Sequence, residues 1–263
     1  MIKIGNEVIA QNTFPDKTLL VKFNPYTVNT FGSVTIQWIY ESDSELFTLI
    51  CLKRHLDQAF PNKSIELELR YIPHARMDRT KSTEDVFTLK YFCEVINSLH
   101  FAEVHVLDAH SNVSLALLNN VTSIPVGTYI RNATVFSAAE ALFFPDEGAM
   151  KRYADESTLP YAFGMKKRDW TTGQILGLDI MNADVIKDKH VLIVDDICSR
   201  GGTFYHSAKA LKAAGAKEVD LYITHCENTI ALGQIFDREL INNIYTTHSL
   251  IHTPEVAERV IYV

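Results

Sequence analysis

The stretch VLIVDDICSRGGTF, residues 191–204, decides the fold. Its first half is a short apolar run that ends in two aspartates, so HVLIVDD (190–196) predicts a buried strand. A polar turn with two glycines follows, and TFYHSAKALKAAG (203–215) then predicts a helix that Gly215 closes. A strand that passes through a glycine-rich turn directly into a helix is typical of a parallel α/β sheet.

The rest of the chain repeats this alternation. Apolar spacing predicts strands at 65–72, 103–110, 218–225 and 242–250, and helices at 42–60 and 82–99 (capped by Ser82). Residues 134–145 predict a helix that a short strand can follow. Segment 146–175 lacks either period and predicts a long irregular loop. Because the alternation runs twice, we expect two α/β domains, 1–125 and 126–263, each a mainly parallel sheet flanked by helices. One large sheet is the alternative.

Composition restricts the class of protein. A chain of 263 residues with 47% hydrophobic residues can form a large core, and its net charge of −7 argues against a nucleic-acid-binding surface. No apolar run approaches the length needed to cross a membrane, and the N-terminus lacks the pattern of a signal peptide. The four cysteines are scattered, which favours a reduced, cytoplasmic setting without a zinc site.

The turn after residue 196 carries the pattern of a phosphate site. Backbone N–H groups of a glycine-rich turn at a helix N-terminus converge on one point, and the helix dipole adds partial positive charge there. The two carboxylates ahead of the turn suit the vicinal hydroxyls of a ribose. The alternative is an ordinary strand–turn–helix junction with two solvated acids. The predicted sugar-phosphate site consists of Asp195, Asp196, Ser199, Arg200, Gly201, Gly202 and Thr203.

A resemblance to a known family rests on several segments in a fixed order. VDDICSRGGT (194–203) resembles the sugar-phosphate signature of the type I phosphoribosyltransferase fold. The whole set resembles the ribose-phosphate pyrophosphokinase family, also called phosphoribosyl pyrophosphate synthetases. The further segments are FPD (14–16), YIPHARMDR (71–79), LDAHSN (107–112), FPDEGAMKR (144–152), KKR (166–168) and AGAKEVDLYITH (214–225).

The resemblance implies a reaction and its catalytic groups. Members of the family move the β,γ-pyrophosphoryl group of ATP to the anomeric hydroxyl of ribose 5-phosphate and release AMP. By this resemblance, His110 and Asp146 would bind Mg²⁺, and Lys166 and Arg168 would close over the transferring group. The alternatives are a buried hydrogen-bonded histidine and a basic surface loop.

The ATP side of the site is implied in the same way. Phe14 would stack on adenine and Asp16 would hydrogen-bond to it, while Arg76, Asp78 and the magnesium-binding His110 would complete the ATP site. In the family the loop that corresponds to residues 14–16 comes from a neighbouring subunit. A homo-oligomer with a shared ATP site is therefore expected.

The chain departs from the family pattern at the phosphate turn. The family reads DTGGT where this chain reads SRGGT, so Ser199 replaces an acid and Arg200 adds a cation. At the adenine loop the family's glycine is Lys17. The extra cation leaves two acceptors open, ribose 5-phosphate and ADP-ribose, whose pyrophosphorylation would serve the rebuilding of NAD.

Two further functions remain as alternatives. A phosphoribosyltransferase would need the turn at 194–203 but not the segments at 71–79 and 107–112. A non-catalytic subunit that associates with a phosphoribosyl pyrophosphate synthetase would tend to lose the magnesium ligands or the catalytic cations, and His110, Asp146, Lys166 and Arg168 are all present.

Overall fold

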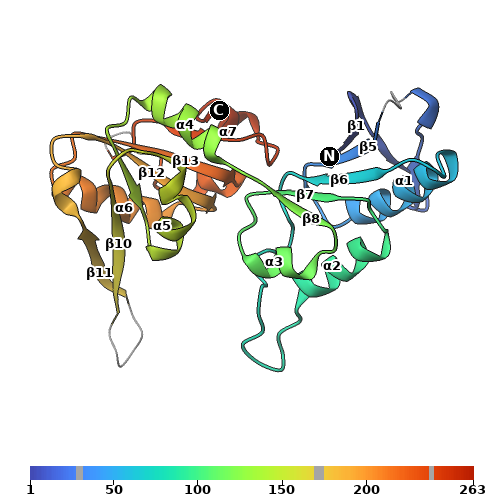
Figure 1. Cartoon of the computed structure of the whole chain (residues 1–263), viewed down its shortest axis with the longest axis horizontal. Helices are drawn as coiled ribbons and strands as arrows, with labels where there is room; N and C mark the ends of the chain where they lie inside the picture. Colours follow the sequence, from blue (N-terminus) through green and yellow to red (C-terminus); the bar gives the residue numbers. More distant parts are fainter. Residues whose placement is uncertain (28–31, 169–174, 237–239) are drawn as a thin grey trace. The chain divides into compact units, whose positions relative to one another are not determined.

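The computed structural model describes residues 1–27, 32–168, 175–236 and 240–263, without the side chains of 166–168 and 175–178. The chain divides into two compact units (Figure 1). The N-terminal unit contains residues 1–124 and 249–251, and the C-terminal unit contains 125–248 and 252–263.

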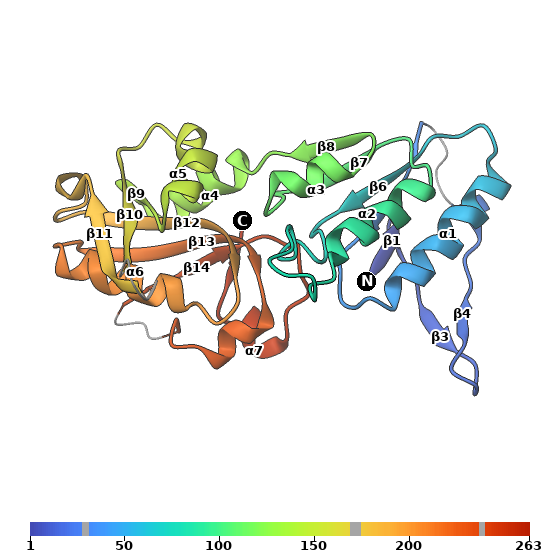
Figure 2. The same ribbon diagram turned by 90° about the horizontal axis from the view of Figure 1, so that it is seen from below.

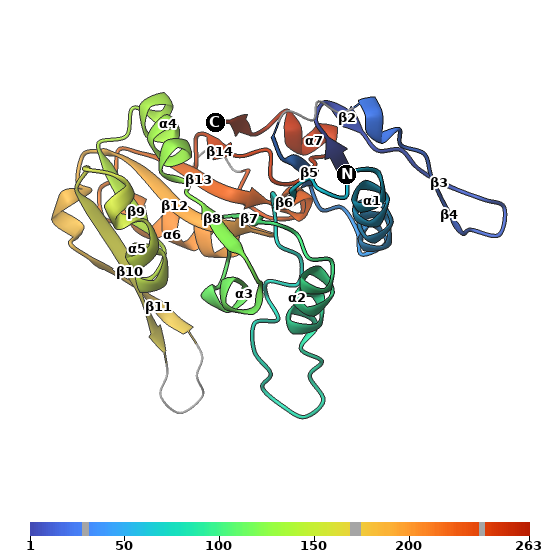
Figure 3. The ribbon, with the colours of Figure 1, turned by 45° about the vertical axis from the view of Figure 1, so that its right-hand side comes forward.

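A six-stranded sheet forms the centre of the N-terminal unit. Its strand order is β2-β1-β5-β6-β7-β8, in which β5 to β8 are parallel and β1 is antiparallel to both of its neighbours. Helices α1 (Glu45–Ala59), α2 (Thr88–Ser98) and α3 (Asn112–Leu117) lie on one face of this sheet (Figures 1 and 3). The strands are β1 (Ile2–Ile4), β2 (Glu7–Val8), β5 (Val34–Trp38), β6 (Ile65–Leu69), β7 (Val104–Leu107) and β8 (Val121–Ile124).

Only one face of this sheet is apolar. Side chains of a strand alternate between its two faces, and β5 and β6 alternate strictly between buried and half-buried residues. The polar members pair across the strands, since Gln37 Nε2 donates to Glu68 Oε1 at 3.1 Å.

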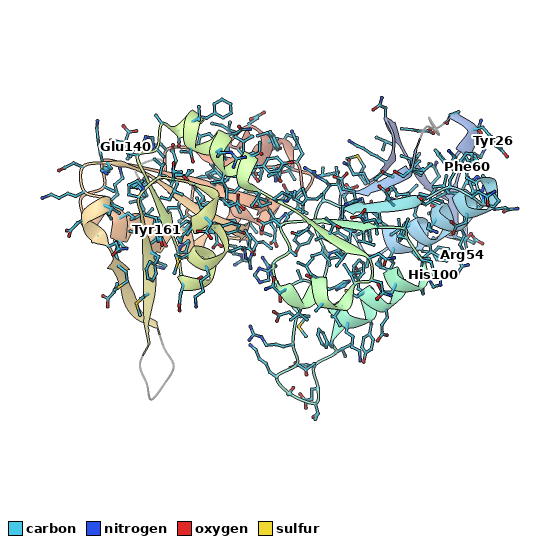
Figure 4. All side chains as sticks on the ribbon, in the orientation of Figure 1. Tyr26, Arg54, Phe60, His100, Glu140 and Tyr161 are labelled. Atoms are coloured by element: carbon cyan, nitrogen blue, oxygen red, sulfur yellow. The ribbon has the colours of Figure 1, made fainter. Side chains whose placement is uncertain are left out.

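Between helix α1 and the short 3₁₀ helix η1 (Pro25–Thr27), Tyr26 meets Phe60 edge to face at 5.9 Å (Figure 4).

A seven-stranded sheet forms the centre of the C-terminal unit. Its order is β11-β10-β9-β12-β13-β14-β15, and every neighbouring pair is parallel except β10 and β11. Helices α4 (Gly127–Ser137) and α5 (Glu147–Tyr153) cover one face, and α6 (Gly202–Ala213) and α7 (Pro254–Ala257) cover the other (Figure 2). The strands are β9 (Ala141–Phe144), β10 (Tyr161–Arg168), β11 (Ile175–Met181), β12 (His190–Cys198), β13 (Glu218–Cys226), β14 (Ile244–Thr246) and β15 (Ile261–Tyr262).

Helices on both faces bury the central strands. β13 is buried at every position after its first residue, and β12 is buried over most of its length. At β9 and β10, Phe144 and Tyr161 pack edge to face at 5.5 Å. Figure 4 labels Tyr161 on its strand. Short 3₁₀ helices η2 (Ala154–Glu156), η3 (Ala183–Val185) and η4 (Asn228–Leu232) complete the unit.

The predicted fold class is confirmed, and so are the strand–turn–helix at 190–215 and the end of its helix. Gly215 takes the left-handed backbone (φ +95°) directly after α6 and its cap. Three local predictions are wrong. The second helix begins at Thr88 instead of Ser82, the helix predicted from residue 134 begins at Gly127, and segment 146–175 contains helix α5 and strand β10 instead of an irregular loop. No helix in the described ranges is long and apolar enough to cross a membrane.

Candidate active site

The two aspartates of the opening stretch lie inside β12, toward its carboxyl end. Asp196 is only 4% exposed, and its Oδ2 accepts a hydrogen bond from Arg152 at 2.7 Å. Arg152 extends from the last turn of α5 and also donates to the Tyr153 hydroxyl at 3.3 Å. Burial opposes its charge, but Tyr153 and Asp196 together raise the pKa of the Arg152 guanidinium. Asp196 is thus held as a buried, paired carboxylate.

A third carboxylate approaches from the neighbouring strand. β9 pairs with β12, and directly after β9 the N-cap of α5 is Asp146, whose Oδ1 accepts from Ala149 N at 3.1 Å. Burial, then the charge of Asp196 and also that of Asp146, raise the pKa of the Asp195 carboxyl well above its usual value. The carboxyl ends of these adjacent strands therefore gather Asp146, Asp195 and Asp196, of which Asp196 pairs with Arg152.

This group of carboxylates suits a magnesium ion that enters the site together with a phosphate-bearing substrate. In the described part of the chain, no three His, Cys, Asp or Glu side chains are grouped to hold a metal ion by themselves. Mg²⁺ usually keeps several waters and uses one or two protein carboxylates together with substrate phosphates. A partly neutralised carboxylate group beside a phosphate turn has that chemistry. His110 lies in the other unit, so its joint role with Asp146 stays a prediction.

The glycine turn has the backbone that a phosphate site needs. Gly201 takes the left-handed conformation (φ +73°) as the N-cap of α6, and a Cβ there would lie 2.7 Å from Ile235 Cδ1. Gly202 differs, because a Cβ at this position would meet no atom within 4 Å. Thr203 follows in the first turn of the helix, where amides point out of the helix end. The backbone beside Gly202 is thus open to a ligand.

The loop after β13 packs closely against this turn. Glu227 N donates to Cys198 O at 2.9 Å, and Ser199 Oγ lies 2.9 Å from Thr229 Oγ1. Gly233 approaches Arg200 so closely that a Cβ would lie 1.8 Å from the Arg200 carbonyl oxygen. The side chain of Arg200 is exposed. The loop after β13 thus fixes the backbone of the turn, and the charged side chain of Arg200 faces solvent.

In the N-terminal unit, the predicted adenine loop is the tip of a hairpin. Strands β3 (Gln11–Thr13) and β4 (Leu19–Val21) form a separate two-stranded ribbon that extends from the unit (Figure 2). Phe14 is 48% exposed, and Asp16 Oδ1 accepts from the Thr18 hydroxyl at 2.7 Å and from Thr18 N at 3.0 Å. These bonds lower the pKa of Asp16. Lys17 takes φ +68°, which explains why a glycine suits this position in the family pattern.

The remaining ATP-side residues follow two neighbouring parallel strands. Arg76 and Asp78 lie in the loop after β6, where Arg76 is exposed and Asp78 pairs with Arg79 at 3.3 Å. His110 follows β7 and precedes Ser111, which caps α3 by accepting from Val113 N at 3.2 Å. Since carboxyl ends of paired parallel strands meet at one edge of a sheet, the structure brings these loops to the same edge.

Sequence reasoning left some residues untested or unassigned. The predicted catalytic residues Lys166 and Arg168 belong to β10, but their side chains are outside the described part, so their role stays a prediction. It did not assign Arg152, although the quoted segment 144–152 ends with this residue. It also missed Glu227 and Thr229, because no motif surrounds them and only the pairing of β12 with β13 brings them to the turn.

Comparisons with known proteins agree with this geometry. A family model described as the phosphoribosyl transferase domain matches residues 149–234. Ribose-phosphate pyrophosphokinase from Saccharolobus solfataricus is 24% identical over 231 residues, covering 86% of this chain and 77% of that protein. Ribose-phosphate pyrophosphokinase 2 from Archaeoglobus fulgidus is 29% identical over 233 residues, with coverage of 85% and 77%.

A solved structure supports the fold of both units. The crystal structure of phosphoribosylpyrophosphate synthetase from Mycobacterium smegmatis matches with a TM-score of 0.72 and 16% identity, covering 97% of this chain and 85% of that one. The sequence relatives and this fold together confirm the predicted resemblance and enzyme class. The chain is similar over most of its length to ribose-phosphate pyrophosphokinases, and it is a transferase.

Proposed function

We propose that the protein transfers the β,γ-pyrophosphoryl group of ATP to the anomeric hydroxyl of a ribose 5-phosphate group and releases AMP. The observation that carries the proposal lies where β12 leads into α6: three carboxylates, of which Asp196 pairs with Arg152, stand beside a glycine turn that is open to a ligand. The named relatives support the reaction class.

Each group at this edge has a role in the proposal. The turn from Ser199 to Thr203 binds the 5-phosphate through backbone N–H groups at the start of α6. Asp195 and Asp196 accept hydrogen bonds from the ribose hydroxyls, and Arg152 fixes the orientation of Asp196. Asp146 would hold magnesium, which would neutralise charge on the ATP oxygens, and His110 is the further ligand that the resemblance predicts.

The donor side follows from the exposed hairpin and the basic strand. Phe14 and Asp16 reach the adenine of ATP bound to a neighbouring subunit, which makes the enzyme a homo-oligomer. Arg76 and Asp78 contact the same nucleotide, and Lys166 and Arg168 stabilise the charge that spreads over the transferring group. All four cysteines are free thiols, which supports a reducing, cytoplasmic setting.

A second acceptor is favoured by one residue. Arg200 is exposed in the phosphate turn, where the family pattern has a small hydroxyl residue. ADP-ribose presents the same anomeric hydroxyl with a diphosphate in place of one phosphate, and a guanidinium binds such a group with charge-assisted bonds. Transfer to ADP-ribose is therefore the second candidate reaction.

A side-by-side assay tests both candidates. Purified protein with Mg²⁺ and ATP receives ribose 5-phosphate or ADP-ribose, and AMP release and product mass are followed. AMP with neither acceptor contradicts the proposed reaction. Arg200→Thr then tests the source of any preference for ADP-ribose: it should lower kcat/KM for ADP-ribose by about tenfold or more, the loss of one charge-assisted bond, and leave ribose 5-phosphate nearly unchanged. Equal loss for both acceptors would exclude Arg200 as the selecting residue.

A further inference from the structure

Ser199 is the first residue of a short chain of hydroxyl groups that ends at a carboxylate. Ser199 Oγ lies 2.9 Å from Thr229 Oγ1, and Thr229 Oγ1 donates to Glu227 Oε2 at 3.2 Å. Ser199 belongs to the phosphate turn, whereas Glu227 and Thr229 belong to the loop that follows β13. Ser199, Glu227 and Thr229 are all half-buried, so the chain connects the turn to a carboxylate behind it.

Counting hydrogens fixes the direction of this chain. A hydroxyl has one hydrogen to donate, and an ionised carboxylate only accepts. Thr229 gives its hydrogen to Glu227, so its oxygen is an acceptor toward Ser199. Ser199 must then donate its own hydrogen to Thr229. What remains on Ser199 Oγ is acceptor capacity alone.

The direction decides what Ser199 can recognise. Phosphate oxygens are acceptors, so an acceptor-only hydroxyl gives them no hydrogen bond. A sugar hydroxyl carries a hydrogen to donate and matches it. The position that holds an acid in the family pattern thus keeps an acid's hydrogen-bonding character, supplied by Glu227 through Thr229.

The loop that supplies this chain is held in place independently. Glu227 N donates to Cys198 O at 2.9 Å, which extends the pairing of β13 with β12 to this point. Ile235 lies against Gly201, and Gly233 lies against the carbonyl of Arg200. The two hydroxyls and the carboxylate therefore sit on backbone that cannot move away from the turn without breaking these contacts.

We infer that Glu227 and Thr229 are positioning residues that hold the Ser199 hydroxyl as a hydrogen-bond acceptor for a hydroxyl of the acceptor sugar. This assignment rests on the proposed function, because it names the part of the acceptor that Ser199 contacts. It separates two tasks within the turn: Gly202 and Thr203 bind the phosphate through the backbone, and Ser199 selects the sugar.

Thr229→Val tests the chain, since valine has the same shape and no hydroxyl. The variant should raise the KM for the acceptor about tenfold, the value of one hydrogen bond, and leave the KM for ATP unchanged. Added to Ser199→Ala, it should cost less than about twofold more, because Thr229 acts through Ser199. Ser199→Asp supplies the acceptor directly and should make the protein insensitive to Thr229→Val.

A matched control is Thr122→Val. The Thr122 hydroxyl also bonds to a carboxylate, that of Glu103, but on the edge strand β8 of the other unit. It should alter neither KM. Additive losses in the Ser199→Ala, Thr229→Val double variant would overturn the inference, and so would a Thr229→Val effect that persists in the Ser199→Asp background.

Calorimetric titration with ribose 5-phosphate in the absence of ATP separates this inference from the proposed reaction. If wild-type protein binds ribose 5-phosphate but never releases AMP, the proposed reaction is wrong. The inference is then tested by measuring the dissociation constants of Ser199→Ala, Thr229→Val and the double variant. If wild-type protein binds neither ribose 5-phosphate nor ADP-ribose, both the inference and the reaction are wrong. Melting curves of each variant confirm that the changes are made in folded protein.

Discussion

At the scale of single residues, Arg152 and Asp196 make the most consequential contact of the site. Asp196 is almost fully buried, and a buried carboxylate is stable only when it is paired. The 2.7 Å bond from Arg152 provides that partner while the guanidinium stays partly exposed. The pair allows a charged group to stand at a buried position of a mainly apolar parallel strand.

The first prediction concerns this pair. Arg152→Met should lower the free energy of unfolding by about 2–3 kcal/mol, because it leaves Asp196 buried without its cation. Its neighbour Lys151 is exposed and pairs with Glu147 one turn away, so Lys151→Met should change stability by less than about 0.5 kcal/mol. Urea unfolding measures both variants. Equal stability of the two would show that the Arg152 pair contributes nothing to folding.

A second prediction concerns a carboxylate at the opposite end of the sheet. Asp220 is fully buried, accepts from Asn243 N at 2.8 Å and lies 3.0 Å from His190 Nε2. Burial raises the pKa of Asp220 above its usual value. Because the pKa of Asp220 is raised in the folded state, folding favours the protonated carboxyl. The contribution of Asp220 to stability is therefore complete below about pH 4 and is lost as the pH rises through the raised pKa.

Asp220→Asn tests this sign. Asparagine is neutral at every pH and still accepts from the Asn243 amide. The free energy of unfolding of wild type relative to the variant should therefore decrease from about pH 4 toward pH 7. Unfolding in urea at a series of pH values gives the difference directly. A difference that grows with pH, or that does not change, would contradict the assignment.

At the scale of elements, the turn between β12 and α6 combines two glycines with separate duties. Gly201 satisfies the backbone, since its φ is positive and Ile235 fills the space where a side chain would stand. Gly202 has an ordinary backbone and open space beside it. Gly201 is therefore required by the fold, whereas Gly202 leaves room for a ligand beside the turn.

The third prediction separates these duties. Gly201→Ala should destabilise the protein by about 1–2 kcal/mol or more, because a left-handed alanine is strained and crowds Ile235. Gly202→Ala should unfold at nearly the wild-type urea concentration yet raise the KM for the acceptor about tenfold or more, by placing a methyl group where the phosphate binds. A Gly202→Ala variant with wild-type kinetics would remove the turn from the binding site.

Element boundaries show where sequence reasoning succeeds and where it does not. At residues 190–215 the apolar run, the glycine turn and the helical spacing all predict the same strand–turn–helix, so this segment could be predicted from the sequence. Ser82 failed as a helix cap because Asp85 accepts from the backbone of Lys81 and Ser82, at 2.6 and 2.9 Å, and closes a local turn instead. The Arg152–Asp196 and Ser199–Thr229 contacts were unpredictable, since they join residues 44 and 30 positions apart.

At the scale of the whole molecule, the proposal requires more than one chain. The hairpin that carries Phe14 and Asp16 is exposed along β3 and only half-buried along β4. The proposal assigns the exposed phenylalanine and the aspartate at this tip to the ATP site of another subunit.

The fourth prediction uses this arrangement. Phe14→Ala and Asp196→Asn should each abolish most of the activity. Mixing the two variants should restore up to roughly a quarter of it, because random dimers then contain sites with both residues intact. Subunit exchange under mild denaturation, followed by the AMP assay, gives the result. A mixture as inactive as its components would show that each chain completes its own site.

Helix caps distinguish α6 from its neighbour. The carboxylate of Asp146 caps α5, whereas the N-cap of α6 is Gly201, which has no side chain to cap the helix. A bound phosphate would therefore complete the helix itself, and recognition would use the same hydrogen bonds that limit fraying of α6. Ligand binding of this kind raises the melting temperature by an amount that grows with the logarithm of the ligand concentration above its dissociation constant. The heat tolerance of this protein thus becomes a measure of which phosphorylated sugars it accepts, readable without ATP, product or turnover.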